Sequence, residues 1–432
     1  MLKNKIIILT AGFIFGLVFL TKANNPNKEN AKNTVSLVSE ELHARGGMPN
    51  FFAKALRGDS IKVGYLGGSI TAQNGWRVFS LDWFKQRFPK TKFAEINAAI
   101  GGTGSDFGVF RVHDHVLKYN PDLVFVEFAV NDGGADAEKI IRSMEGIVRQ
   151  VWQHNPTTDI CFVYTIANNF LETEQSGQVS QSSSTMEKVA DKYQIASINF
   201  GFEVAKQEKN NQLIFKGESK ELNGIKVFSP DGVHPYPETG HKIYQEVLQR
   251  SFEKMVTEMP VRSKKHILHK PMALDNFANA QMVDPTQAKL SKNWKIIQTK
   301  NSSSVSGFSQ FLQQIGKASQ TGETMKVHFK GQAIGISDIM GPDAGKVIVE
   351  IDGAVKDTIS RFDAYCTYRR MNYFLIDHLG NKDHEVVFRV LSEPFDKAAI
   401  LAKNGNVIKN PDDYKENNWY VGKILIDGSL LP

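Results

Sequence analysis

The sequence predicts an α/β domain built on a parallel sheet, followed by an antiparallel β-sandwich of the jelly-roll type. The chain has 432 residues, which is too long for one ordinary hydrophobic core and indicates two domains. From Ile61 onward, short apolar runs alternate with helical periodicities, which is the pattern of βαβ units. Near Val256 this alternation ends, and the remaining chain shows short runs with period-two alternation between turn residues.

Residues 1–23 have the pattern of a signal peptide. Lys3 and Lys5 precede an apolar run over residues 6–20, and the small residues that a signal peptidase reads end at Ala23. The alternative is a transmembrane anchor, but the run is shorter than the roughly 20 residues that span a bilayer. We therefore expect an exported protein, periplasmic, cell-surface or secreted, with no membrane span in the mature chain.

Four segments are expected after the signal peptide. Residues 24–59 form a polar leader and N-terminal segment, with a short helix over residues 39–45. Residues 60–258 form the α/β domain, and the basic stretch over residues 259–275 is interpreted as a linker. Residues 276–432 form the β-sandwich.

Five apolar runs of the α/β domain are expected to form strands that are buried on both faces, as in a parallel sheet covered by helices. Functional groups in such sheets gather at the carboxyl ends of the strands. Apolar residues recur at helical spacing over residues 78–88, 140–151 and 243–255. The five expected strands cover residues 61–66, 93–100, 123–130, 160–166 and 195–200.

The β-sandwich prediction depends on short alternating runs and on the turn residues between them. Turn signals occur at residues 341–343, 352–353 and 380–381. The alternating runs cover residues 325–336, 346–351, 373–376, 385–390 and 423–426.

Charge and cysteine content exclude some classes of function. The formal net charge is +6, but no dense Lys/Arg stripe with interleaved aromatic residues occurs, so no nucleic-acid partner is expected.

Cys161 and Cys366 are the only cysteines. Cys161 lies in an apolar run and is interpreted as a buried free thiol; the alternative is a disulfide between the two domains. No cluster of His and Cys has ligand spacing, so no metal site is expected.

Polar and glycine residues follow three of the predicted strands. Ser69 follows the first, in the sequence GGSIT, and its own backbone N–H is placed to face an anion. A glycine-rich loop over residues 97–105 follows the second, and Asn131 follows the third, where its side-chain amide could donate to an oxyanion. The alternative for each is an ordinary turn or a helix cap.

The strongest single signal is the sequence DGVHP before the last predicted helix. The three-residue spacing lets the Asp231 carboxylate accept a hydrogen bond from one nitrogen of the His234 imidazole. The other nitrogen is then free to take a proton from a serine. The alternative for each residue taken alone is that Asp231 forms a turn and that His234 is a surface histidine. Together with Ser69, the pair predicts an acyl-transfer site.

These four features resemble the SGNH (GDSL-like) hydrolase superfamily. The blocks are GGSIT, the loop around Gly102, AVND and DGVHP, and they occur in family order over residues 60–256. Two positions depart from the commonest form: Gly68 stands where the family has Asp, and Ala129 stands where a glycine is frequent. The resemblance implies a flavodoxin-like three-layer α/β/α fold, with Ser69 as nucleophile and His234 as general base and then acid.

The resemblance also implies the remaining roles. Asp231 would orient the imidazole. The oxyanion would be held by the backbone N–H groups of Ser69 and Gly102 and by the side-chain amide of Asn131. The implied reaction is ester hydrolysis through an acyl-Ser69 intermediate, with no cofactor and no metal.

A β-sandwich after such a domain is similar to arrangements in bacterial carbohydrate esterases. We therefore expect removal of O-acetyl groups from a poly- or oligosaccharide, and an acylated glycan as the substrate. One alternative is a lysophospholipase or short-chain lipid esterase, and another is a non-catalytic glycan-binding surface protein. Trp76 could stack on a sugar ring, with core packing as the alternative. The sequence indicates no oligomeric state.

Overall fold

The computed structural model describes residues 38–391 and 393–432. The predicted signal peptide and the first part of the predicted leader lie outside the described residues. Among the residues that are described, no helix is long and apolar enough to cross a membrane.

A six-stranded sheet forms the centre of the N-terminal region, with strand order β1-β6-β5-β4-β2-β3. The five predicted strands are all present and pair in parallel, and β1 joins the edge antiparallel to β6. Because β2 and β4 are neighbours, the loops that follow these two strands emerge side by side. The strands are β1 (Leu42–His43), β2 (Ile61–Gly67), β3 (Phe93–Asn97), β4 (Leu123–Glu127), β5 (Asp159–Tyr164) and β6 (Ala196–Asn199).

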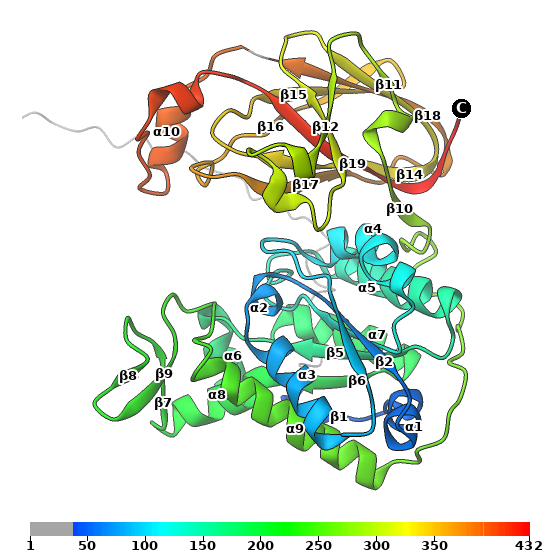
Figure 1. Ribbon diagram of the computed structural model, residues 1–432, viewed down its shortest axis with the longest axis vertical. Helices are drawn as coiled ribbons and strands as arrows, with labels where there is room; N and C mark the ends of the chain where they lie inside the picture. The colour runs from blue at the N-terminus through cyan, green and yellow to red at the C-terminus, as the bar shows by residue number, and fades with distance from the viewer. Residues whose placement is uncertain (1–37, 392) are drawn as a thin grey trace, which may run out of the picture. The chain divides into compact units, whose positions relative to one another are not determined.

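Helices cover both faces of this sheet, which gives the expected three layers (Figure 1). One face packs against α1 (Pro49–Arg57), α3 (Trp76–Arg87), α8 (Phe200–Lys209) and α9 (Gly240–Glu258). The other face packs against α4 (Ser105–His115), α5 (Ala137–His154) and α7 (Gln181–Tyr193). Shorter elements are α2 (Ser69–Ala72), α6 (Leu171–Gln175) and a small sheet of β7 (Leu213–Lys216), β8 (Glu221–Leu222) and β9 (Ile225–Ser229).

Two details of the prediction for this region are wrong. The short helix expected over residues 39–45 is not formed, because β1 lies there and pairs with β6, with Leu42 opposite Ile198. Strand β3 is not buried on both faces, because it lies at the sheet edge and exposes Glu95. The prediction also lacked helix α1, although Phe51 of this helix is completely buried in the core.

The C-terminal region is an antiparallel, sandwich-like arrangement of ten strands, as predicted. Its long central strand β14 pairs with β19 along one side, and with β18 and then β17 along the other. The strands are β10 (Ala280–Val283), β11 (Lys289–Leu290), β12 (Lys295–Gln298), β13 (Gln314–Ala318), β14 (Thr324–Met340), β15 (Lys346–Ile351), β16 (Ala354–Ser360), β17 (Arg370–Ile376), β18 (Lys382–Leu391) and β19 (Trp419–Leu430), and one helix, α10 (Lys397–Ala402), accompanies them.

The two cysteines are both free and buried. Cys161 lies in β5, and Cys366 lies before β17 in the C-terminal region. The buried free thiol is therefore the correct alternative for Cys161, and the interdomain disulfide is wrong.

Candidate active site

The structure brings Ser69, His234 and Asp231 together in one hydrogen-bonded line. Ser69 Oγ lies 2.8 Å from His234 Nε2, and His234 Nδ1 lies 2.7 Å from Asp231 Oδ2. Ser69 begins the short helix α2 directly after β2, whereas the other two residues precede α9. With a proton on Nδ1, the imidazole donates to the carboxylate and presents Nε2 as an acceptor to the serine hydroxyl.

A tight turn over residues 229–234 positions the carboxylate and the imidazole. Asp231 Oδ1 accepts hydrogen bonds from the backbone N–H groups of Val233 and His234, each at 2.8 Å. Gly232, between Asp231 and Val233, has a φ of +87°, which a residue with an L side chain rarely adopts. The local sequence DGVH therefore encodes the turn, because Asp and Gly are the residues that such a turn requires.

These hydrogen bonds keep Asp231 ionised. Partial burial by itself would raise its pKa, but hydrogen bonds from the His234 side chain and from the N–H groups of residues 233 and 234 lower the pKa well below its ordinary value. A carboxylate that stays negative at neutral pH stabilises a positive charge on the neighbouring imidazole.

Asn131 and the 97–105 loop lie beside the serine. A Cβ built at Gly68 would overlap the Asn131 side-chain oxygen, so the amide packs directly against the backbone that precedes Ser69. A Cβ at Gly101 would contact Ser69 Cβ at 3.5 Å. Gly102 has a φ of +72° and no atom within 4 Å of its Cβ position, so this part of the loop is open. The close approach of Asn131 leaves no room for a side chain at position 68 in this structure.

Glu127 is a structural support that the sequence reasoning missed. It ends β4, is 1% exposed, and accepts hydrogen bonds from Thr71 Oγ1 at 2.7 Å and Thr165 Oγ1 at 2.8 Å. Burial raises the pKa of Glu127, while bonds from the two threonines and from the Gly68 N–H lower it. The residue thus connects the ends of β2, β4 and β5 below the serine. The sequence did offer a signal for Glu127, because it is the one acidic residue in the apolar run of β4.

Trp76 does not reach the site, so its predicted role in sugar stacking is wrong. It is 0% exposed and packs edge-on against Tyr65, Phe125 and Phe200 in the core. Its backbone N–H donates to His241 Nδ1 at 3.1 Å. The alternative of core packing is therefore correct.

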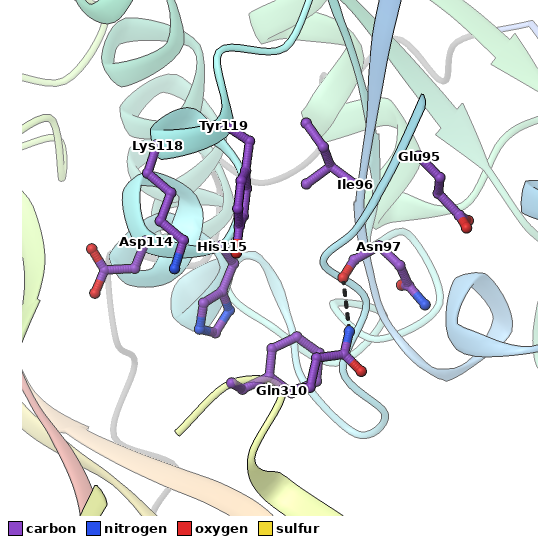
Figure 2. A pocket seen from close by; sticks show the side chains of 9 residues that line it. Glu95, Ile96, Asn97, Asp114, His115, Lys118, Tyr119 and Gln310 are labelled. Carbon is purple, nitrogen blue, oxygen red and sulfur yellow. Dashed lines mark hydrogen bonds between the residues drawn. The ribbon is translucent and has the colours of Figure 1, made fainter. Parts of the chain in front are cut away.

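A cavity of about 200 Å³ lies elsewhere, at the edge strand β3 and the C-terminal end of α4. Figure 2 shows His115 and Lys118 on one side, with Gln310 hydrogen-bonded to the Asn97 carbonyl on the other. None of the predicted site residues lines this cavity, so it is separate from the serine site. Within residues 38–391 and 393–432, no group of three or more His, Cys, Asp or Glu side chains is placed to hold a metal ion.

Comparisons with known proteins concern the family and the fold. Residues 57–242 match the model of the GDSL-like Lipase/Acylhydrolase family. No curated protein matches the chain in sequence. Two crystal structures of a two-domain esterase (CEX) active on acetylated mannans resemble the chain over both regions, each at 19% identity and over 98% of the esterase.

One of these structures, co-crystallised with mannopentaose, covers 91% of this chain with a TM-score of 0.68. The other covers 90% with a TM-score of 0.69. At this identity the likeness concerns the fold, including the C-terminal β-sandwich. Residues 57–242, which hold Ser69, Asp231 and His234, are therefore similar to the GDSL-like lipase/acylhydrolase family, and both regions share the fold of the two-domain esterase.

Proposed function

We propose that this protein is a serine esterase that removes O-acetyl groups from a poly- or oligosaccharide through an acyl-Ser69 intermediate. The observation that carries the proposal is the hydrogen-bonded line from Ser69 Oγ through the His234 imidazole to Asp231. A hydroxyl is a weak nucleophile by itself, and an adjacent oriented base is what activates it.

In the proposed reaction, Ser69 Oγ attacks the ester carbonyl while His234 Nε2 takes its proton. The backbone N–H groups of Ser69 and Gly102 and the amide of Asn131 donate to the resulting oxyanion. His234 then protonates the departing sugar hydroxyl, and a water molecule hydrolyses the acyl-serine with the same imidazole as base. Acetate and the free hydroxyl are the products, and the chain's own residues supply each step.

The choice of an acetylated glycan is supported by the fold. The neighbouring structures, which share both regions with this chain, are described as an esterase active on acetylated mannans. We extend that substrate class to this protein. The signal-peptide pattern of residues 1–23 adds the proposal that the enzyme works outside the cytoplasm, where glycans of this kind occur. Sequencing the N-terminus of the mature protein tests that proposal.

The proposed activity is tested by measuring acetate release from a panel of acetylated mannan, xylan and other glycans, with Ser69→Ala as the control. We expect release by the wild type from at least one glycan, and a loss of at least about 10³-fold in Ser69→Ala. Preferential hydrolysis of long-chain 4-nitrophenyl esters would instead indicate a lipid esterase. Equal values for wild type and Ser69→Ala on every ester would indicate a non-catalytic glycan-binding protein.

A further inference from the structure

A small polar cavity of about 90 Å³ lies directly beside Asn131. One wall comes from the start of α4 and the loop after β4, and another comes from Tyr373 on strand β17 of the C-terminal region. Since Asn131 also packs against the residue that precedes Ser69, the cavity adjoins the place where an ester would react.

Asp132 lines this cavity, and one of its carboxylate oxygens has no hydrogen-bond partner among the described residues. Its side chain is 3% exposed, and its Oδ1 accepts a hydrogen bond from the Ser105 backbone N–H at 3.0 Å. Its Oδ2 is buried and accepts no hydrogen bond from the described part of the chain. A buried acceptor without a partner costs free energy, and a ligand that brings a donor removes that cost.

Two other polar side chains of the cavity, Tyr373 and Lys139, are already paired with Asp106. The Tyr373 hydroxyl donates to Asp106 Oδ1 at 2.5 Å, and Lys139 Nζ lies 2.5 Å from Asp106 Oδ2. The Tyr373 ring is stacked on Phe107, with ring centroids 4.8 Å apart and an interplanar angle of 14°. This arrangement fixes the wall contributed by the C-terminal region, and Asp132 Oδ2 is the carboxylate oxygen of the lining that has no partner in the part of the chain that the structure describes.

The chemistry of the lining selects the class of ligand. Two acidic side chains and one ammonium group leave no net positive charge, which disfavours an anion, and the cavity is too small and too polar for a long acyl chain. A neutral group that carries hydroxyl donors fits, because each hydroxyl can donate to a carboxylate oxygen.

We propose that this cavity is a sugar-hydroxyl subsite, in which Asp132 Oδ2 accepts a hydrogen bond from a free hydroxyl of the glycan next to the scissile ester. This inference rests on the proposed function and adds to it a residue that selects carbohydrate esters over simple ones. Tyr373 gives the β-sandwich a direct part in forming the subsite.

The test compares wild type and Asp132→Asn on two substrates, an acetylated oligosaccharide and 4-nitrophenyl acetate, which has no sugar hydroxyl. The amide keeps an oxygen for the Ser105 N–H but replaces the free acceptor by a donor. We expect the ratio of kcat/KM for the oligosaccharide to that for 4-nitrophenyl acetate to fall at least about tenfold, mainly through KM. Asp82→Asn, on the exposed face of α3, is the matched control and should leave the ratio unchanged.

A binding measurement separates recognition from catalysis. Calorimetric titration of the acetylated oligosaccharide should show at least about tenfold weaker binding to Ser69→Ala/Asp132→Asn than to Ser69→Ala. If wild type hydrolyses the oligosaccharide and Asp132→Asn changes neither the ratio nor this affinity, the subsite is wrong. It is also wrong if Asp132→Asn lowers kcat/KM for both substrates by the same factor. If wild type hydrolyses 4-nitrophenyl acetate but no glycan, the proposed function fails and the subsite with it.

Discussion

At the scale of single residues, hydrogen bonds and burial shift the pKa values of two acids, Asp231 and Asp132, in opposite directions. Asp231 is half exposed and surrounded by donors, which keep its carboxylate charged. Asp132 is buried with fewer donors, and burial raises its pKa to about 7, although hydrogen bonds from Ser105 lower it. The first acid is suited to support a cationic imidazole, and the second to receive a neutral hydroxyl.

His234→Ala should abolish turnover. Without the imidazole, no base takes the proton of Ser69, and we expect kcat to fall by at least about 10³-fold. His113→Ala, on the exposed side of α4, is the matched control. Activity is measured with 4-nitrophenyl acetate and the fold by circular dichroism. Normal turnover in a folded His234→Ala would contradict the role given to this residue.

Asn131→Ala should lower kcat by about 10²–10³-fold with little change in KM, because an oxyanion donor acts mainly in the transition state. Steady-state kinetics on one acetate ester measure both constants, with the exposed Asn404→Ala as control. An effect on KM alone would count against an oxyanion role for this amide.

Asp132 should also make stability depend on pH. Its pKa is about 7 in the fold and about 3.9 when unfolded, so between these values the folded state binds the extra proton and stability falls as pH rises. The loss is on the order of 4 kcal/mol at most. Asp132→Asn lacks this loss. Urea unfolding should therefore show that the free energy of unfolding of Asp132→Asn rises relative to that of wild type between pH 5 and pH 8. A difference between the two that does not change with pH would contradict the raised pKa of Asp132.

At the scale of elements, the site is assembled where β2, β4 and β5 end. Glu127 holds these ends through Thr71, Thr165 and the Gly68 N–H, and α2 starts with Ser69 directly above. The parallel order of β2 and β4 brings Asn131 to the same edge of the sheet. The position of the serine therefore depends on close packing at one glycine as well as on the strand itself.

Gly68→Ala should disturb both stability and activity. The added Cβ would overlap the Asn131 amide, so the turn or the amide must move, at a cost of about 1–3 kcal/mol. We expect a lower melting temperature together with a reduced kcat. Gly307→Ala, whose added Cβ meets no atom within 4 Å, is the control. Unchanged kcat in Gly68→Ala would show that this close approach is not needed.

At the scale of the whole molecule, Arg142 of α5 connects the α/β region to the C-terminal region. Its side chain is 1% exposed and donates to Asp377 at 2.5 Å and 3.0 Å, and to the Asp275 carbonyl at 3.1 Å. Its guanidinium lies 4.4 Å from the centre of the Phe277 ring. Together with Tyr373 on Phe107, this contact makes the β-sandwich a neighbour of the active-site loops.

Arg142→Ala should destabilise the protein by about 3–5 kcal/mol, because it leaves the largely buried Asp377 without its partner. Arg389→Ala breaks a more exposed pair with Glu350 and should cost at most about 1 kcal/mol. Urea unfolding of the two variants gives the comparison. Equal and small losses would mean that the contact contributes little to the connection between the regions.

The sequence by itself determined the two-part architecture, most strands and the long helices. Periodicity of apolar residues encodes these elements locally, as in β2, β15 and α5. It also indicated which residues to group, since Ser69 and Asn131 follow predicted strands and DGVHP precedes the last predicted helix. The structure brings Ser69 and Asn131 together because the carboxyl ends of the neighbouring parallel strands β2 and β4 share one edge. DGVHP follows β9 of the small sheet, and His234 reaches Ser69 from there.

Only the tertiary structure decided the features that depend on partners far along the chain. The segment around Leu42 became a strand because β6 offered a free edge, and Trp76 is in the core because three aromatic rings surround it. The cavity beside Asn131 exists because Tyr373 meets Asp106 across 267 positions of sequence. Local patterns carry no information about such distant contacts, since burial and hydrogen-bond partners are set only when the whole chain packs.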